Sequence, residues 1–567
     1  MFIHKSLFTP LLALVVGTAG SIIASNDVPL IGPSFSSNFD PSDSKALSAA
    51  KAGFPDLIKS LFSAGALNQT DLVFTVDVFS AATNTSIYSY SHVGEGQNGT
   101  LTADVLNDNT ISRLGSVTKL FTVYAILAQA GLEVFNHPVT RYLPELAGNH
   151  GDDSWDKVNW DDVTIGALAS HQAGSGGAAD FLKAYENDAG KYTPEEFLTY
   201  MRDVKHAVIS PFRNAVYSDG GFAILGLVLQ RLSGVPCKDA MRDILFKPLE
   251  LDGMSVKAPT ASDVNAIDRS RVYNTSAWGI DVEIVTASGG LYGSTADLRT
   301  AGLSILNSEL LSPATTRAWM KPHSGTGSLV ELVGAPWEIS RLTIPVTPGS
   351  NRTRVSDLYT KAGGNGDYTC IFALSPDHGI GYSILIAGAT ASSARWPLRN
   401  LVGETFIPAA EHAAAENAES NLTGTFVDES SAGTNLTLTV DKGSPGLGLE
   451  SFYVNGTDIR AILLGATKPI PVSARLYPTG PNSFSRSLSS LYRTKGTMRM
   501  SYRMVGLALP LAPRAAVEGG NGGLFDNSFA WMNVGFSGTL DEFIFEVVDG
   551  QLVSVTSPGT KLVLKRA

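Results

Sequence analysis

Hydrophobic positions in the first part of the chain change from helical to strand-like spacing. Over 46–67 apolar residues recur three or four positions apart, which predicts an amphipathic helix. The apolar stretches 72–79 and 86–90 flank the polar residues 82–85 and predict a β-hairpin. Segment 114–128 is apolar on most faces, which predicts a helix buried on all sides.

The middle of the chain continues the mixture of helices and strands. Helical patterns cover 163–169, 222–234 and a segment that follows the glycine turn at 289–290 and is capped by Ser294 or Thr295. Two apolar runs, 368–376 and 380–388, are separated by Pro-Asp-His-Gly and predict adjacent antiparallel strands.

The pattern changes again near residue 409. Residues 409–418 are rich in Ala and Glu and predict a helical connector. Short strands are then predicted at 436–440, 452–454, 459–464, 500–505, 543–548, around 553 and at 562–564. We therefore expect a catalytic-sized domain over 25–408, a linker over 409–421, and an all-β domain of lipocalin-like or sandwich type over 422–567.

The N-terminus has the layout of a signal peptide. His4 and Lys5 precede the apolar run 7–16, and small residues follow, which predicts a cleaved signal over 1–24. The alternative is a buried N-terminal helix. The remaining chain has no stretch near the roughly 20 apolar residues that cross a bilayer, so no membrane span is expected after signal removal.

Eight N-x-S/T triplets support a secreted, extracellular glycoprotein. The candidate glycosylation sites are Asn68, Asn84, Asn98, Asn274, Asn351, Asn421, Asn435 and Asn455. Only two cysteines are present, Cys237 and Cys370, and their spacing does not tell whether they form a disulfide.

Charge and missing motifs exclude several classes of function. The formal net charge is -11 without a block of Lys or Arg, which makes nucleic acid an unsuitable partner. The sequence has no H-E-x-x-H, C-x-x-C or G-x-S-x-G motif, so zinc-protease, zinc-finger and α/β-hydrolase functions lose their usual support. We expect no metal and no cofactor.

Ser116 and Lys119 are the chemical candidates at the start of the buried segment 114–128. Residues three apart lie on one face of a helix, so the lysine would lie beside the serine hydroxyl. A serine hydroxyl is a weak nucleophile and needs an adjacent base, which a desolvated lysine can provide. The same S-x-x-K spacing occurs without a buried helix at Ser42, Ser48 and Ser154.

Three other residues carry candidate chemistry. Tyr217, just before the predicted helix 222–234, could enter a cleft as a general acid or base, or could pack with its hydroxyl satisfied. Lys361 is expected on or near an edge strand, where alone it would be interpreted as a surface lysine. His171 lies in a glycine-rich loop, and we favour a structural role, in which it bonds backbone and holds the turn, over a catalytic one.

In this order, Ser116-Val-Thr-Lys119, Tyr217-Ser-Asp219 and Lys361-Ala-Gly363 resemble the three motifs of the serine β-lactamase and penicillin-binding-protein superfamily. The tyrosine in the middle motif is similar to the class C branch, which includes esterases, D-aminopeptidases and transesterases. Framing stretches such as Gly334-Ala-Pro-Trp-Glu338 resemble secreted fungal members. The resemblance implies an α+β fold, with an antiparallel sheet flanked by helices, followed by a small all-β domain.

The resemblance also implies roles for these residues. Ser116 would be the acyl-forming nucleophile, Lys119 its base partner and Tyr217 the second proton-transfer group. Lys361 would hold the tyrosine in a useful ionisation state or meet a substrate carboxylate. The backbone N–H groups of Ser116 and Gly364 would form the oxyanion hole, and Asp219, Gly363 and Gly364 would contact substrate.

Two residues depart from the family pattern. Asp219 stands where asparagine is usual, so the side chain keeps an acceptor and loses a donor. An ionised Asp219 beside Lys119 would favour the charged lysine and shift the role of base toward Tyr217, so the identity of the base stays open. Ala362 stands where threonine is common and removes a hydroxyl that could bind a lactam carboxylate. Both changes favour esters over antibiotics.

The sequence therefore predicts a secreted serine hydrolase that cleaves a small-molecule ester or amide through an acyl-enzyme on Ser116, as an esterase rather than a true β-lactamase. The same intermediate could pass its acyl group to an alcohol, which would make the protein a transesterase of secondary metabolism. The alternative from another class is a catalytically silent module that binds lactams or peptides on the same fold.

Overall fold

The computed structural model describes residues 32–178, 181, 183, 193–260, 264–347, 350, 352–464, 466–468, 470–482, 496–508, 531, 534–535 and 538–567. The predicted signal segment and the candidate site Asn351 lie outside these residues. The chain forms two compact units. One comprises Ser37–Leu342 and Asp357–Ala413, and the other comprises Thr343–Ser356 and Ala414–Ala567 with the described residues before Ser37.

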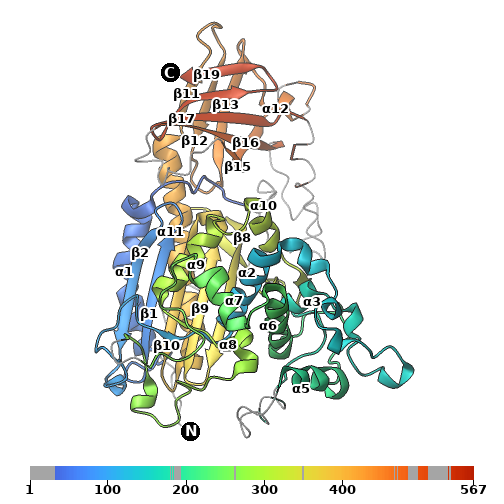
Figure 1. The fold of residues 1–567 in the computed structure, drawn as a ribbon. Coiled ribbons are helices and arrows are strands. Elements are labelled where there is room, and N and C mark those ends of the chain that lie inside the picture. The colour runs from blue at the N-terminus through green and yellow to red at the C-terminus, as the bar shows by residue number, and fades with distance from the viewer. Residues whose placement is uncertain are drawn as a thin grey trace, which may run out of the picture. The chain divides into compact units, whose positions relative to one another are not determined.

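The first unit is organised around an eight-stranded antiparallel sheet (Figure 1). The strand order is β2-β1-β10-β9-β8-β7-β6-β5. The strands are β1 (Val73–Ser80), β2 (Thr85–Val93), β5 (Ser324–Gly325), β6 (Glu331–Val333), β7 (Glu338–Pro345), β8 (Thr353–Asn365), β9 (Tyr368–Ser375) and β10 (Ile380–Ala387). The predicted β1–β2 hairpin and the predicted β9–β10 pair are both confirmed.

Helices cover both faces of this sheet. Phe54 of α1 (Lys45–Ser63) contacts Tyr88 of β2 and Phe406 of α11 (Ala391–Asn421), which places both helices on one face. Gly302 of α9 (Thr295–Leu306) lies against Phe79, whose side chain points to the other face of β1. The predicted cap of α9 is Ser294, which forms a capping box with Asp297.

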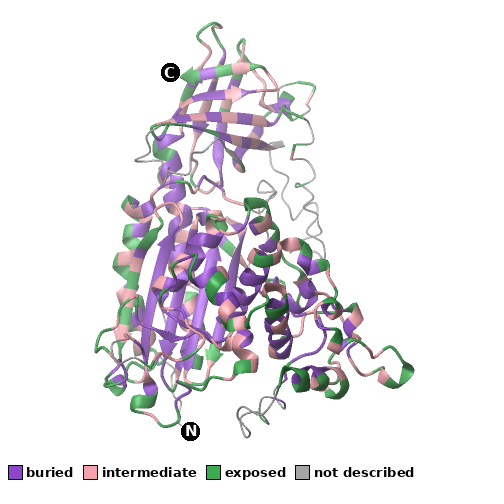
Figure 2. Cartoon of the chain, in the orientation of Figure 1, coloured by how far each residue is buried: buried purple, intermediate pink, exposed green. Residues whose placement is uncertain are grey.

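The other helices lie close to the candidate residues. They are α2 (Thr118–Ala130), α3 (Ile165–Ala169), α5 (Pro194–Thr199), α6 (Asp219–Ser233), α7 (Cys237–Met241), α8 (Thr286–Gly289) and α10 (Pro313–Trp319). Every residue of α2 from Thr118 to Leu127 is buried, as the sequence predicts (Figure 2). The helix ends where Gly131 adopts a positive φ of 72°, a conformation that favours glycine.

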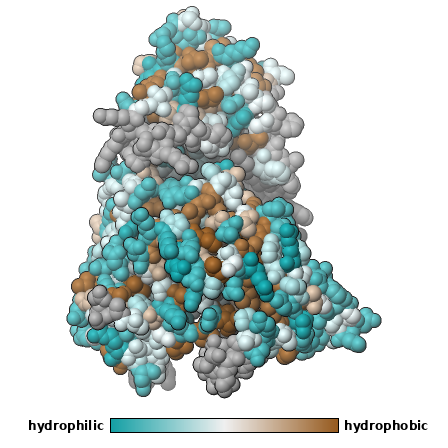
Figure 3. All heavy atoms as spheres, viewed as in Figure 1, coloured by the Kyte–Doolittle hydropathy of each residue, from teal (hydrophilic) through white to brown (hydrophobic). Residues whose placement is uncertain are grey.

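No single helix among the described residues is both long and apolar enough to cross a membrane. The segments Asp219–Ser233 and Cys237–Phe246 meet the length and composition criteria only when taken together, and they are bent by 73° at their break. On the face shown in Figure 3, polar and apolar residues are interspersed.

The C-terminal unit contains a closed antiparallel barrel, which decides between the barrel and the sandwich left open by the sequence. The strand order is β12-β11-β19-β18-β17-β16-β15-β13-β14, and an additional β12–β13 pairing closes the sheet. The strands are β11 (Gly424–Val427), β12 (Asn435–Thr439), β13 (Leu447–Val454), β14 (Thr457–Asp458), β15 (Val472–Asn482), β16 (Thr497–Ala508), β17 (Glu542–Val548), β18 (Gln551–Ser557) and β19 (Leu562–Arg566). Buried and partly exposed residues alternate along β17, as an inward-facing and an outward-facing row require.

One predicted strand of this domain is wrong. Residues 459–464 form the short helix α12 (Arg460–Leu463) instead. Asp458 explains the difference, because its carboxylate accepts a hydrogen bond from the Arg460 backbone N–H (3.1 Å) and also pairs with the Arg460 guanidinium. An acidic side chain that accepts from the first backbone N–H groups favours a helical turn over an extended strand.

The residues expected to form a linker, 409–421, lie in the last turns of α11, a continuous helix of 31 residues. The helix contains Pro397 and Pro408, and it extends from the sheet-bearing unit into the sequence of the barrel-bearing unit. The Ala- and Glu-rich composition of this segment suits a helix because both residues have high helix propensity.

Candidate active site

Ser116 lies in a 3₁₀ turn, Gly115–Val117, that leads directly into α2. Gly115 has a positive φ of 52°, which favours glycine. The turn packs against β8 so closely that a Cβ added to Gly363 would lie 1.9 Å from the Leu114 carbonyl oxygen and 3.0 Å from the Ser116 nitrogen. Gly363, two residues after Lys361, therefore allows strand β8 to approach the backbone of the serine turn.

Lys119 connects the first two motifs to α8. Its side chain is fully buried, and its Nζ donates to Ser116 Oγ at 3.0 Å and to Asp219 Oδ1 at 2.6 Å. It also donates to the carbonyl oxygen of Ser288 at 2.9 Å and to Ser288 Oγ at 2.8 Å. The predicted proximity of Ser116 and Lys119 is thus present as a direct hydrogen bond.

These partners define what Lys119 can do. The Asp219 carboxylate and the Ser288 carbonyl are acceptors only, so each takes one hydrogen from Nζ. Nζ carries at most three hydrogens for its four partners, so the carbonyl and the hydroxyl of Ser288 share one of them. The position that faces Ser116 Oγ then holds the third hydrogen of an ammonium or the lone pair of a neutral amine. In the amine form Lys119 is placed to take the serine proton, and in the ammonium form it is placed to return one.

Asp219 is the first residue of α6, which Ser218 caps by accepting the Gly221 N–H at 2.8 Å. Burial by itself raises the pKa of Asp219, but Lys119 and Ser288 stabilise the carboxylate and bring its pKa below the usual value. Ser288 Oγ donates to the same Oδ1 at 2.8 Å. Asp219 was predicted to contact substrate, but its described side-chain hydrogen bonds are to Lys119 and Ser288.

The ring of Tyr217 lies close to the side-chain nitrogens of both Lys119 and Lys361. The centroid of its ring is 4.9 Å from Lys119 Nζ and 5.2 Å from Lys361 Nζ. The residue is 45% exposed, so a ligand can reach it. Among the described residues, Ser116 Oγ has a hydrogen bond to Lys119 and none to Tyr217, which places Lys119 nearer to the nucleophile in the unliganded site.

His171 packs against the ring of Tyr217. The two rings stack at 4.5 Å, and His171 Nδ1 accepts the backbone N–H of Ser218 at 3.2 Å. Burial, with smaller effects from Lys119 and Lys361, lowers the pKa of His171 well below its ordinary value, so the imidazole is neutral. The geometry agrees with the structural interpretation of this histidine, which holds the loop and the tyrosine motif together.

Lys361 occupies an interior strand, so its expected position on or near an edge strand is wrong. Strand β8 lies between β9 and β7, with β6 and β5 beyond. Lys361 is buried and forms an ion pair with Glu338 of β7. Burial disfavours the charged lysine, but Glu338 and then Tyr217 outweigh it and raise the pKa of Lys361 above its ordinary value.

Backbone nitrogens meet beside the serine. The nitrogen of Gly364 lies 2.5 Å from the position that a Cβ on Gly115 would occupy, so strand β8 brings this nitrogen next to the Ser116 turn. Arg395 of α11 donates to the neighbouring Gly363 carbonyl at 3.1 Å. The N–H groups expected to form an oxyanion hole, those of Ser116 and Gly364, therefore belong to two segments in close contact.

The sequence gives no direct sign of two further polar groups at the site. Ser288 lies next to the glycine turn that precedes α9. One of its two contacts with Lys119 is made by its backbone carbonyl oxygen, which any residue type would provide, so the sequence carries no signal for it. Glu338 belongs to a stretch with family resemblance, and only the pairing of β7 with β8 places it beside Lys361.

The sequence pattern of the beta-lactamase family matches residues 84–403. The chain belongs to this family. Residues 414–567 match a second pattern, described as "Beta-lactamase-like-like, C-terminal domain". Together with the sheet, helices and barrel described above, these matches confirm the expected fold class and the expected resemblance, and they identify the chain as a hydrolase of the beta-lactamase superfamily.

Several relatives are similar over most of the chain. The beta-lactamase-like protein of Arthroderma benhamiae is 28% identical over 446 residues, which cover 71% of this chain and 72% of that protein. The probable hydrolase clz13 of Cochliobolus lunatus is 26% identical over 430 residues, which cover 67% of this chain and 66% of that protein. The beta-lactamase/D-alanine carboxypeptidase of Pseudomonas syringae has a TM-score of 0.48 at 14% identity, covering 63% of this chain and 99% of that one.

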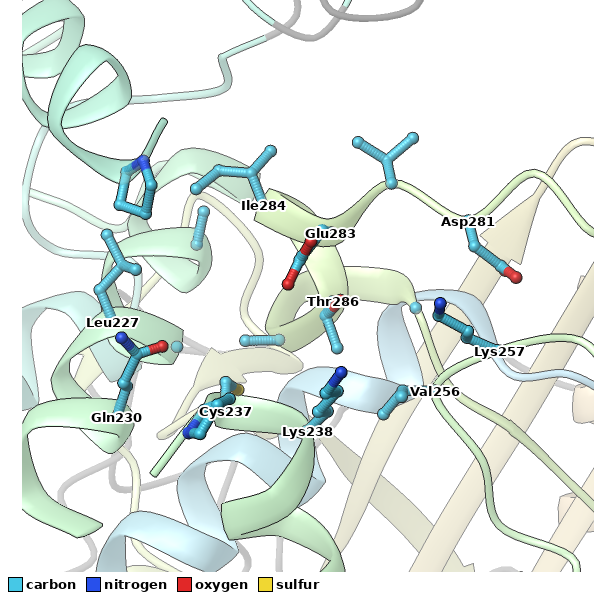
Figure 4. A pocket seen from close by; sticks show the side chains of 17 residues that line it. Leu227, Gln230, Cys237, Lys238, Val256, Lys257, Asp281, Glu283, Ile284 and Thr286 are labelled. Atoms are coloured by element: carbon cyan, nitrogen blue, oxygen red, sulfur yellow. The ribbon is translucent and has the colours of Figure 1, made fainter. Parts of the chain in front are cut away.

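A separate cavity of about 450 Å³ lies beside the site (Figure 4). Its walls come from α6, α7 and residues 281–287, and they include Thr286 and Ala287 but none of the motif residues. Because Ser288 of the same helix binds Lys119, α8 separates the cavity lining from the lysine network. No group of His, Cys, Asp or Glu side chains in the described ranges is arranged to hold a metal ion.

The cysteines and the glycosylation candidates can now be placed. Cys237 and Cys370 are both free, so they do not form the disulfide left open by the sequence. The expectation that Asn421 is a glycosylation site is wrong. Its side chain is buried and bonded to Asn417 and Gln551, which leaves no room for a glycan. Asn435 is partly exposed, and the exposed candidates are Asn68, Asn84, Asn98, Asn274 and Asn455.

Proposed function

We propose that this chain is a serine hydrolase that forms an acyl-enzyme on Ser116 and acts on carboxylic esters rather than on β-lactams. The observation that carries the proposal is the hydrogen bond of 3.0 Å between Ser116 Oγ and the buried Lys119 Nζ, within a network that also contains Asp219. A nucleophile in contact with a buried proton acceptor is the arrangement that acyl transfer requires.

The proposed reaction has two steps. Ser116 Oγ attacks the ester carbonyl while its proton moves to Lys119, directly or through Tyr217, and the oxyanion accepts from the N–H groups of Ser116 and Gly364. The C–O bond to the alcohol then breaks, and the alcohol leaves with that proton. Water adds to the acyl-enzyme by the same route, which releases the carboxylic acid and frees Ser116.

The preference for esters rests on two side chains. Asp219 offers no N–H to the amide carbonyl of a lactam side chain, and its described Oδ1 bonds go to Lys119 and Ser288. Ala362 has no hydroxyl for a substrate carboxylate. We also propose that the protein is exported and glycosylated, a proposal supported by the N-terminal pattern and the exposed Asn-x-Ser/Thr sites.

Hydrolysis of 4-nitrophenyl butyrate and of nitrocefin tests the function. We expect the wild type to hydrolyse the ester and the Ser116→Ala variant to lose at least about 10,000-fold in kcat/KM. The matched control is Ser154→Ala, which alters another S-x-x-K tetrapeptide outside the site. Ester hydrolysis that survives in Ser116→Ala, or nitrocefin turnover faster than ester turnover, would contradict the proposal.

A further inference from the structure

The cation at the active-site end of β8 is already bound to a carboxylate of the chain. Glu338 begins β7, the neighbour of β8 in the sheet. Its Oε1 accepts from Lys361 Nζ, and its Oε2 accepts from the backbone N–H of Ala362 at 2.9 Å. An ammonium group and a neighbouring N–H thus converge on the two oxygens of one carboxylate.

Such a pair of donors is a general receptor for carboxylates, because charge-assisted hydrogen bonds hold both oxygens at once. Here the carboxylate of Glu338, a residue of the same chain, already occupies this receptor. The Lys361 side chain is 1% exposed and that of Glu338 is 40% exposed. An incoming substrate therefore meets the side chain of Glu338 before it can reach the lysine.

In the second ion pair of the site, the lysine is again buried and the carboxylate is again exposed. The Lys119 side chain is fully buried, whereas that of its partner Asp219 is 43% exposed. Both lysine nitrogens are thus beneath the surface and both carboxylates are at it. The surface that a substrate contacts is therefore acidic.

Arg395 is another cation close to β8, but it lies on a different side of the strand. The Cβ position of Gly364 faces the Arg395 guanidinium at 3.2 Å, whereas the Cβ position of Gly363 faces the Ser116 turn. Successive residues of a strand point to opposite faces. The guanidinium is further held by the Gly363 carbonyl and lies over the Trp396 ring.

We propose that Glu338 makes this site selective for neutral esters and excludes substrates that carry a carboxylate near the scissile bond. The inference rests on the proposed function, since it names the substrate class of the same site. Its physical basis is repulsion between like charges beside the buried lysines, together with the loss of Lys361 as a free receptor.

Matched ester substrates test this selectivity. The first pair is 3-carboxyphenyl butyrate and its methyl ester, which differ by one negative charge on the leaving group. The second pair is 4-nitrophenyl hydrogen glutarate and its methyl ester, which place the charge on the acyl part. The readout is the ratio of kcat/KM for the neutral ester to kcat/KM for the anionic ester.

We expect the wild type to favour the neutral ester by at least about tenfold in one or both pairs, and Glu338→Gln to reduce that ratio by about tenfold. Glutamine keeps an acceptor for the Ala362 N–H but removes the charge. Glu331→Gln, an exposed carboxylate on the neighbouring strand β6, is the matched control and should leave the ratio unchanged.

The ratio separates the possible outcomes. If Glu338 only maintains structure, Glu338→Gln lowers both rates and leaves the ratio unchanged, which overturns the inference. A wild-type preference for the anionic ester also overturns it, while Ser116-dependent hydrolysis preserves the proposed function. If folded wild-type protein hydrolyses none of the four esters, the proposed function and the inference fall together.

Discussion

Replacing Gly363 by alanine should damage the site through geometry alone. The added Cβ would lie 1.9 Å from the Leu114 carbonyl oxygen, whereas ordinary contact requires at least 3.4 Å, so strand β8 or the serine turn must move by about 1.5 Å. The same Cβ would lie 3.0 Å from the Ser116 nitrogen. The shift therefore moves the serine turn and strand β8 apart. It separates the Ser116 N–H from the Gly364 N–H, the two groups that would stabilise the oxyanion.

A displacement of about 1 Å in a reacting group typically costs about 100-fold in rate. We therefore expect Gly363→Ala to lose at least about 100-fold in kcat on 4-nitrophenyl butyrate, or about 2.7 kcal/mol of transition-state stabilisation. The crowding should also lower the free energy of unfolding by about 1–3 kcal/mol. Stopped-assay kinetics and urea unfolding measure the two effects separately.

The matched control is Gly325→Ala on β5, because a Cβ at Gly325 meets no atom within 4 Å. This variant should retain wild-type kinetics. Folded Gly363→Ala protein that keeps more than about a third of wild-type kcat would refute the argument that β8 and the serine turn are in obligatory contact.

Three further predictions concern single side chains. The pKa of His171 is well below its ordinary value of 6.5 in the folded chain, so the unfolded chain binds one more proton below that pH, and this residue should lower stability by up to about 1.4 kcal/mol per pH unit as pH drops below 6.5. The stability of the wild type, measured by urea unfolding, should therefore fall more steeply with acid than that of His171→Asn, and an identical slope in both would contradict the prediction. Cys237 is partly exposed beside the cavity, but burial raises the pKa of its thiol to about 12. Ellman's reagent should therefore react with it about a thousandfold more slowly than with an ordinary thiol at pH 8, and rapid reaction in the native state would contradict this prediction. The buried hydroxyl of Tyr502 has no hydrogen-bond partner in the described chain, so Tyr502→Phe should leave barrel stability unchanged or raise it by up to about 1 kcal/mol; a clear loss in thermal unfolding would reveal a partner for that hydroxyl.

Local patterning predicted the elements that dominate the catalytic unit. The β1–β2 hairpin, the β9–β10 pair and the buried helix α2 have strong hydrophobic periodicity and clear turn residues, so the sequence alone located them. The helix α12 replaced a predicted strand because the bonds of the Asp458 carboxylate to Arg460 outweighed a short apolar run. Periodicity over so few residues does not distinguish helix from strand.

The candidate site was predictable as a set of motifs but not as a network. The sequence singled out Ser116, Lys119, Tyr217 and Lys361, and the structure brings their side chains together. It could not place Lys361 inside the sheet, because β7, which pairs with the other side of β8, has no regular alternation of buried and exposed residues to detect. The contacts of Ser288 and Glu338 depend on tertiary packing and have no local signature.

The central claim is that Ser116 is acylated, and intact-protein mass spectrometry of an acyl-enzyme tests it most directly. Wild-type protein treated with a fluorophosphonate or a slowly released ester should gain one adduct, and peptide mapping should place it on Ser116. The Ser154→Ala variant should gain the same adduct and Ser116→Ala none. An adduct that persists in folded Ser116→Ala, or no adduct on folded wild-type protein, would contradict the account.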